Sequence, residues 1–166
     1  EINTANALVH PQLDLAQSVD CRFEWRLPAG WALATSFGTT VSRGSGDRQR
    51  FRGPWNDVAN AMFAAGDFRL VRSRTGRGVL VTAIRGKFGF SDAEANEKIV
   101  KLIQLERDFW RDYSFPYFVV TLAPYGTGQS GTGGGGFTNG FNLYTANEGP
   151  FSPGLLSLLS HEIFHT

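Results

Sequence analysis

Two histidines lie four residues apart near the end of the chain, in the pattern His161-Glu162-x-x-His165. On an α-helix, residues four apart lie one above the other on the same face, so both imidazoles can reach one metal ion. Glu162 can project toward the same ion, where its carboxylate could hold and deprotonate a metal-bound water molecule. The pattern therefore predicts a helix that bears two metal ligands and a general base.

The residues before this motif favour a buried helix. Ser152 and Pro153 predict its start, because a hydroxyl N-cap is often followed by proline at the first helical position. An apolar stripe at helical spacing would fix the helix in a core. The stripe consists of Leu155, Leu158, Leu159 and Phe164.

The alternative is a helix whose two histidines bind nothing. A catalytic zinc needs three protein ligands and an open position for water. Only two candidate ligands are evident here, because His10 is the only other histidine and Cys21 the only cysteine. The single cysteine also excludes an intramolecular disulfide.

The composition is that of an ordered globular protein. Hydrophobic residues make up 42% and aromatic residues 13% of the 166 residues, enough for one domain, or for one domain and part of another. A net charge of +1 gives no reason to expect nucleic acid or an anionic membrane as a partner. No apolar run is long enough to span a bilayer. The first residue is Glu1 rather than methionine, so we expect a removed N-terminal segment or tag; periplasmic, secreted and cytoplasmic locations all stay open.

The first half of the sequence predicts β-structure. Residues 39–53 are polar and glycine-rich and predict a loop or irregular hairpin, and the basic cluster within them is interpreted as a solvated loop rather than a binding patch. Residues 56–65 have the composition of a short helix. Strands are predicted at 19–25, 31–37, 68–72 and 78–85, the last two as a pair. Short strands at this spacing favour a β-sandwich or an open sheet.

The pattern changes at residues 86–90, where we place a domain boundary: residues 1–88 form a β-rich N-terminal domain and residues 89–166 begin a second domain. Ser91 and Glu94 form a capping box. Helical spacing of apolar residues follows, at Ala95, Ile99, Leu102, Ile103, Phe109, Trp110 and Tyr113. Residues 116–123 then predict a strand buried on both faces.

Seven glycines lie between Tyr125 and Phe137. A nucleotide-phosphate cradle is rejected, because no Lys-Ser/Thr follows and the glycines do not have the strand-to-helix G-x-G-x-x-G placement. Two interpretations stay open: a flexible surface loop, or an extended glycine backbone that lies close beside a substrate backbone, as in strand addition. Residues 137–144 predict a short strand after it.

Together these features resemble the M61 family of metallopeptidases, the glycyl aminopeptidase type, whose catalytic domain is similar to that of thermolysin and belongs to the gluzincins. The most specific match is Leu158-Leu159-Ser160-His161-Glu162-Ile163-Phe164-His165-Thr166. A β-rich domain, a long helix, a strand and a Gly-Gly edge segment precede it, as in the family. The resemblance implies an α+β fold, in which a sandwich-like β-rich N-terminal domain is followed by the beginning of a thermolysin-like α/β catalytic domain.

The resemblance also implies a zinc-dependent peptidase. His161 and His165 would be zinc ligands, and Glu162 the general base that activates water for attack on a peptide carbonyl. In gluzincins the third ligand is a glutamate on a later helix, which this sequence does not contain. We therefore expect a fragment that holds zinc weakly and is inactive by itself.

One departure from the family concerns substrate recognition. Similar family members have Gly-Gly-x-Glu-His in the edge strand, where the acidic residue recognises the free amino terminus of a substrate. Aligning Gly133 and Gly134 with the Gly-Gly pair places Gly136 and Phe137 at the Glu and His positions. The substrate-binding residues implied by the resemblance are Gly134, Gly135, Gly136 and Phe137. Without the carboxylate, an endopeptidase is as plausible as an aminopeptidase.

Two hypotheses of function follow. In the first, the chain is the N-terminal portion of a zinc metallopeptidase that acts on peptides or proteins. In the second, it is a non-catalytic module that binds peptides through its β-domain and the glycine-rich edge segment. The oligomeric state stays open in both.

Overall fold

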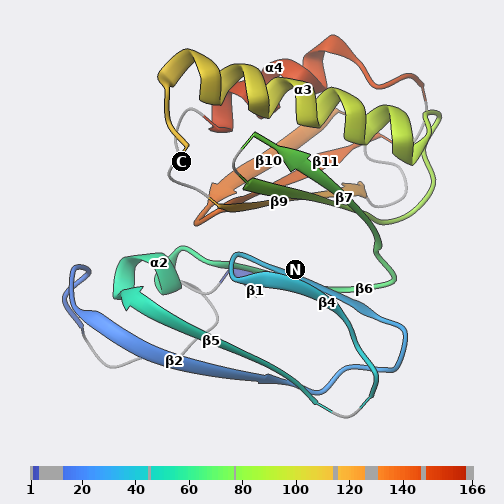
Figure 1. Cartoon of the computed structure of the whole chain (residues 1–166). Helices are drawn as coiled ribbons and strands as arrows, with labels where there is room; N and C mark the ends of the chain where they lie inside the picture. The colour runs from blue at the N-terminus through green and yellow to red at the C-terminus, as the bar shows by residue number, and fades with distance from the viewer. Residues whose placement is uncertain are drawn as a thin grey trace.

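The computed structural model describes residues 2–3, 13–44, 46–76, 78–113, 116–125, 131–146 and 149–163. Two helices cover one side of a five-stranded sheet, and the other strands lie on its opposite side (Figure 1). The five-stranded sheet has the order β10 (Thr132–Phe137), β11 (Gly140–Thr145), β9 (Tyr117–Pro124), β8 (Gly78–Ile84) and β7 (Arg69–Thr75). The four-stranded sheet has the order β1 (Ile2–Asn3), β6 (Met62–Gly66), β3 (Ala32–Thr35) and β4 (Gly38–Val41).

A separate ribbon pairs β2 (Ser18–Trp25) with β5 (Asp47–Pro54). The helices are α2 (Trp55–Ala59), α3 (Asp92–Trp110) and α4 (Pro153–Ile163). This strand-rich mixture of sheets and helices confirms the predicted α+β class. No helix in the described part of the chain is long and apolar enough to cross a membrane.

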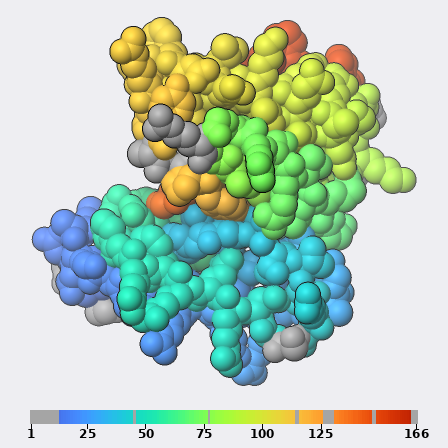
Figure 2. Space-filling model, in the orientation of Figure 1, coloured from blue at the N-terminus to red at the C-terminus, as the bar shows by residue number. Residues whose placement is uncertain are grey.

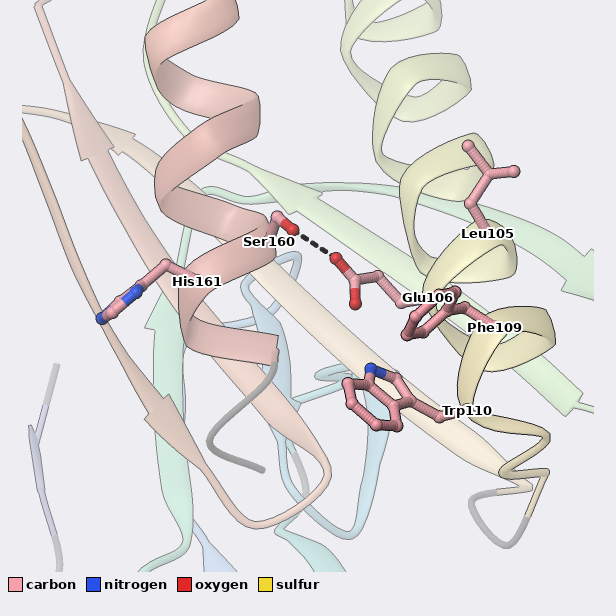
Figure 3. A pocket seen from close by; sticks show the side chains of 6 residues that line it. All are labelled: Leu105, Glu106, Phe109, Trp110, Ser160 and His161. Carbon is pink, nitrogen blue, oxygen red and sulfur yellow. Dashed lines mark hydrogen bonds between the residues drawn. The ribbon is translucent and has the colours of Figure 1, made fainter.

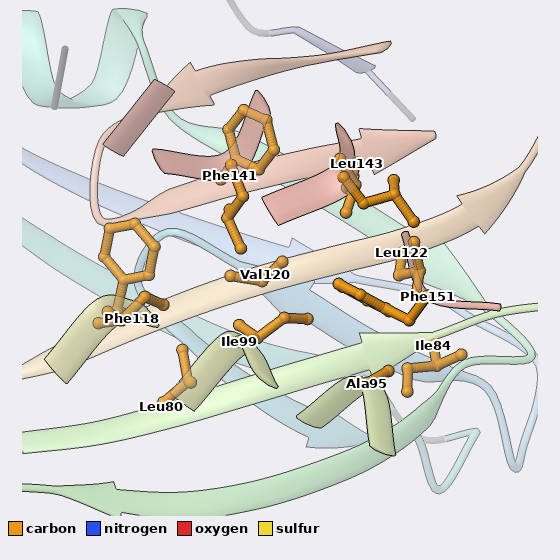
Figure 4. Close-up of a cluster of buried hydrophobic side chains, with 13 residues drawn as sticks. Leu80, Ile84, Ala95, Ile99, Phe118, Val120, Leu122, Phe141, Leu143 and Phe151 are labelled. Carbon is orange, nitrogen blue, oxygen red and sulfur yellow. The ribbon is translucent and has the colours of Figure 1, made fainter. Parts of the chain in front are cut away.

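The five-stranded sheet is mixed. Its three inner strands β11, β9 and β8 run parallel, and the edge strands β10 and β7 pair antiparallel to their neighbours. Helix α3 is the crossover between the parallel strands β8 and β9, the connection that parallel pairing requires. One face of the sheet and the two helices enclose the larger hydrophobic core (Figure 4). Its members include Leu80, Phe118, Val120, Phe141 and Leu143 from the sheet, Ile99 from α3, and Leu155 and Leu159 from α4.

The opposite face of this sheet packs on the four-stranded sheet. Met62 of β6 and Ala34 of β3 join Val81 and Val119 in a second buried cluster. Tyr117 Oη donates a hydrogen bond to the carbonyl of Thr35 across the interface, at 3.1 Å. Strand β9 is buried on both faces for this reason, as its dense apolar sequence predicted.

The predicted boundary between residues 88 and 89 falls between β8 and α3. Strands β7 and β8 precede it and β9, β10 and β11 follow it, yet all five belong to one sheet. This sheet therefore takes strands from both predicted domains, and the chain passes from one sheet to the other between β6 and β7.

Both long helices begin where the sequence predicted. Ser91 Oγ accepts a hydrogen bond from the Glu94 backbone N–H at 3.1 Å, so Ser91 is the N-cap of α3. Ser152 Oγ accepts from the Leu155 N–H at 3.3 Å and caps α4 in the same way. The strand pair predicted at 68–72 and 78–85 is confirmed by β7 and β8, which pair antiparallel.

Two predictions in the first half are wrong. Residues 39–53 are not a loop, because β4 continues to residue 41 and β5 begins at Asp47. The predicted helix at 56–65 ends at Ala59, and its second half is strand β6. Strand β6 pairs with β1 and β3 while its side chains contact the five-stranded sheet, so tertiary packing overrides helix-forming composition there.

Candidate functional site

Helix α4 is held over the β10 edge of the five-stranded sheet. Leu155 and Leu159, four residues apart, are buried against the sheet, and the helix packs on β10, β11 and α3. The rest of the predicted stripe differs in burial: Leu158 is half-buried, and Phe164 lies outside the described residues. Because the buried leucines fix the rotation of α4, they also decide where the following polar residues point.

Ser160 and His161 leave α4 in different directions (Figure 3). Ser160 faces α3, where its hydroxyl donates a hydrogen bond to Glu106 Oε1. His161 is exposed and projects away from α3 (Figure 3). Glu162 is half-buried and, one residue further along the helix, turns about 100° from His161. The helix that bears both residues packs on β10.

His165 and the other two residues of the predicted motif region, 164 and 166, lie outside the described residues. The pairing of His161 with His165 thus stays a prediction from helical spacing. Within the part of the chain that the structure describes, no three His, Cys, Asp or Glu side chains come together as a metal site. The chemistry of the donors still suits zinc, since an exposed imidazole and an adjacent carboxylate sit on an ordered helix.

Strand β10 contains the four residues implied in substrate binding. It is an edge strand, paired on one side with β11, where Gly134 lies opposite Leu143 and Gly136 opposite Phe141. Those partners belong to the core under the helices, so Gly134 and Gly136 share the face of the sheet that α4 covers. The side chain of Phe137 instead packs against the second cluster on the opposite face.

Two of the four glycines of β10 are required by close neighbours. A Cβ on Gly133 would overlap the hydroxyl of Tyr125, and one on Gly134 would overlap the Phe141 ring and the carbonyl oxygen of Asn142. The segment is thus extended strand from Thr132 onward rather than a flexible loop. This geometry fits the second of the two interpretations, an extended glycine backbone at a sheet edge.

Sequence reasoning missed Glu106 on α3. It lines an open hollow of about 540 Å³ between the last turns of α3 and α4, together with Leu105, Phe109, Trp110, Ser160 and His161. Its bond to Ser160 joins residues that are 54 positions apart in the sequence. No local sequence pattern indicates such a contact, because it depends on how the two helices pack against each other.

The comparisons with known proteins concern the fold. No protein-family model matches the sequence, and no curated protein matches it. Among solved structures, the chain is similar to the crystal structure of an aminopeptidase N family protein from Idiomarina loihiensis, with a TM-score of 0.70 and 17% sequence identity. The chain therefore shares the fold of part of that protein. The match covers 89% of this chain and 27% of that protein, so the chain spans little more than a quarter of its length.

Proposed function

We propose that this chain is the portion of a zinc-dependent peptidase that supplies two zinc ligands and the general base. The observation that supports this most directly is the position of His161 and Glu162: they lie at the end of a core-anchored helix that packs on a glycine-rich edge strand. The similarity in fold to an aminopeptidase N family protein agrees with it. The finer assignment to the glycyl aminopeptidase type rests on the motif in the sequence.

The residues of the chain have separate tasks in this proposal. His161 and His165 would hold the zinc ion, which would act as a Lewis acid on the scissile carbonyl. The Glu162 carboxylate accepts the proton of the attacking water and returns it to the leaving amine. Leu155 and Leu159 keep the helix in register with the sheet, so that these groups stay at the β10 edge.

Strand β10 is the proposed platform for the substrate backbone. Its second edge faces away from β11, and an extended peptide that pairs there would lie beside α4. Gly134, Gly135 and Gly136 bring no side chains that would hold the substrate backbone away. No carboxylate stands in β10 to bind an amino terminus, so cleavage within a chain is as compatible with this platform as aminopeptidase activity.

The test is a peptidase assay on the longest natural polypeptide that contains this chain. We expect zinc-dependent hydrolysis, and we expect Glu162→Gln to lower kcat by about a hundredfold or more, the usual effect of losing a general base. Zinc content and thermal unfolding should stay unchanged, since the substitution is isosteric. The matched control is Glu97→Gln on the exposed side of α3, which should leave kcat unchanged.

Full turnover by the Glu162→Gln variant would refute this mechanism. Peptide binding without turnover, unaffected by a chelator, would instead support the second candidate, a non-catalytic module. That candidate is favoured by one observation only, the exposed glycine-rich edge of β10, which could pair with a peptide without any metal.

A further inference from the structure

The β2–β5 ribbon has two unlike faces. On its inner face, Phe23 and Phe51 pack with Phe37 of the turn between β3 and β4, with ring centroids 5.7 Å and 4.5 Å from that of Phe37. Alternate residues point outward, and nearly all of them are charged. We call this outer surface the arginine face; it consists of Arg22, Arg26, Arg48, Arg50 and Arg52 together with Asp20 and Glu24.

Two carboxylates form ion pairs with four of the five arginines. Asp20 accepts hydrogen bonds from Arg50 Nε at 2.6 Å and from Arg52 Nε at 3.0 Å. The hydrogen bond from Arg50, and to a smaller extent that from Arg52, holds the pKa of Asp20 well below its usual range. This carboxylate is therefore ionised and paired with both arginines. Glu24 pairs with Arg26 at 3.3 Å and with Arg48 at 3.6 Å. The face keeps an excess of positive charge, although the whole chain has a net charge of only +1.

The excess positive charge of the arginine face is concentrated at one cross-strand pair. Arg22 lies directly opposite Arg50, and like charges in that position repel. Among the described residues, Arg22 forms no ion pair. Together with Arg48 and the carboxylate of Glu24, which is already paired with Arg26 and Arg48, these two side chains line an open hollow of about 430 Å³ over the ribbon backbone. An anionic group placed in this hollow would relieve the repulsion and receive charge-assisted hydrogen bonds from guanidinium groups.

The spacing of the arginines selects an extended ligand. Arg48, Arg50 and Arg52 alternate along one strand, so their side chains recur about every 7 Å. Alternate residues of an extended polypeptide have the same repeat. We propose that the arginine face is a docking surface for an acidic protein segment that lies extended along β5, with carboxylates at alternate positions.

The alternative polyanions fit less well. Nucleic acid would place a uniform row of phosphates over Asp20 and Glu24, which alternate with the arginines and would repel it. The arginine face has no apolar side chain that could insert into an anionic membrane. A polypeptide that lies along β5 keeps its carboxylates over Arg48, Arg50 and Arg52, beside rather than over Asp20 and Glu24 of the neighbouring strand.

The surface is remote from the candidate zinc site. Strands β2 and β5 lie at the opposite side of the molecule from α3 and α4 (Figure 1), and the space-filling view shows the teal atoms in the lower part and the yellow-green atoms of α3 in the upper part (Figure 2). Docking there would therefore leave β10 and α4 accessible. The inference holds whether or not the proposed peptidase activity is correct.

The test is fluorescence anisotropy with the 166-residue chain and a twelve-residue peptide of alternating Glu and Thr that bears an uncharged dye. We expect saturable binding that weakens as salt is raised, and no binding of the Lys-Thr counterpart. Arg48→Glu reverses a charge on a side chain that is 82% exposed, so the fold should tolerate it; it should weaken binding by at least about tenfold. Arg74→Glu, the same change at an exposed position of β7, should weaken it by less than about twofold.

Three results would overturn the proposal. The first is no binding of the acidic peptide at low salt. The second is an equal loss of affinity in Arg48→Glu and Arg74→Glu, which would show a general charge effect. The third is tighter binding of an oligothymidylate or of phosphatidylserine vesicles than of the peptide, lost in Arg48→Glu; that result would assign the face to nucleic acid or to a membrane surface instead.

Discussion

Gly134 and Gly135 are neighbours in β10 but point to opposite faces of the sheet. On the side of α4, Gly134 meets the Phe141 ring and the Asn142 carbonyl oxygen so closely that no Cβ fits. On the other side, a Cβ on Gly135 would be 3.3 Å from Asn142 Oδ1 and 3.8 Å from the Phe137 ring, contacts that a small shift accommodates. Substitutions at these two positions therefore distinguish a glycine that is needed because a side chain has no room from one that is needed for its backbone flexibility.

This difference predicts opposite tolerance to alanine. Gly134→Ala should lower the free energy of unfolding by about 1–3 kcal/mol, because it overpacks the edge of the core. Gly135→Ala, the matched control, should change it by less than about 0.5 kcal/mol, the usual range for an accommodated surface change. Urea unfolding followed by circular dichroism measures both. Equal stability of the two variants would show that the glycines serve flexibility and not close packing.

At the scale of elements, the start of α3 combines a cap with an ion pair. Asp92, the first helical residue, accepts hydrogen bonds from Arg69 of β7 at 2.7 and 2.8 Å. That pair holds the pKa of the Asp92 carboxyl below its usual range. A carboxylate in the first turn also interacts favourably with the helix dipole. The pair thereby ties the crossover helix to the edge of the sheet it covers.

The sign of the pH dependence follows from the lowered pKa. Asp92 releases its proton more readily in the folded than in the unfolded chain, so its stabilising effect is complete above the unfolded pKa of about 4 and disappears as the pH falls through the folded value. We expect Asp92→Asn to cost about 0.5–1 kcal/mol at pH 7, an amount limited by solvent screening of this partly exposed pair. The cost should shrink toward zero as the pH falls through the lowered pKa of Asp92 in the folded chain.

Thermal unfolding of wild type and variant between pH 3 and pH 7 tests this. Glu97→Gln removes a charge from an exposed position of the same helix and should show no such pH dependence. A constant difference between Asp92→Asn and wild type across the pH range would contradict the ion-pair explanation.

The elements that the sequence predicted well are those in which local pattern and packing agree. In α3 the spacing of Ala95, Ile99 and Ile103 coincides with the buried face, and Ser91 marks its start. In β6, by contrast, the run from Met62 to Gly66 has no period of its own, and its strand form depends on partners 28 or more positions away, such as Thr35 opposite Phe63. In β5, the alternating arginines form a strand pattern, but the glycines on both sides of them favoured the prediction of a loop or irregular hairpin.

For the candidate site, local pattern predicted the start of α4 and left the glycine-rich segment open between a flexible loop and an extended backbone. The Glu106–Ser160 contact and the direction of His161 depend on how α4 lies against α3 and β10. Such a placement is set by the burial of Leu155 and Leu159 among side chains from three strands and helix α3, information that no single segment contains.

For the whole molecule, Met62 joins the two sheets. It is completely buried, its backbone N–H bonds to Ser36 Oγ at 2.7 Å, and its sulfur lies 3.8 Å from Thr121 Oγ1 of β9. Its methyl group also lies where a Cβ on Gly140 would approach it, at 3.3 Å. Because this side chain contacts both sheets, we expect them to unfold together rather than one before the other.

Met62→Ala should therefore destabilise the whole chain by about 2–5 kcal/mol, through the cavity it leaves between the sheets. The exposed Val41→Ala in β4 is the control and should cost less than about 0.5 kcal/mol. Tryptophan fluorescence reports mainly on the first half, where Trp25, Trp31 and Trp55 lie, and far-ultraviolet circular dichroism includes the helices of the second half. A single transition, shifted equally in both signals by Met62→Ala, fits one cooperative unit. A fluorescence transition that moves alone would show that the four-stranded sheet and the ribbon unfold independently of the sheet that bears the candidate site.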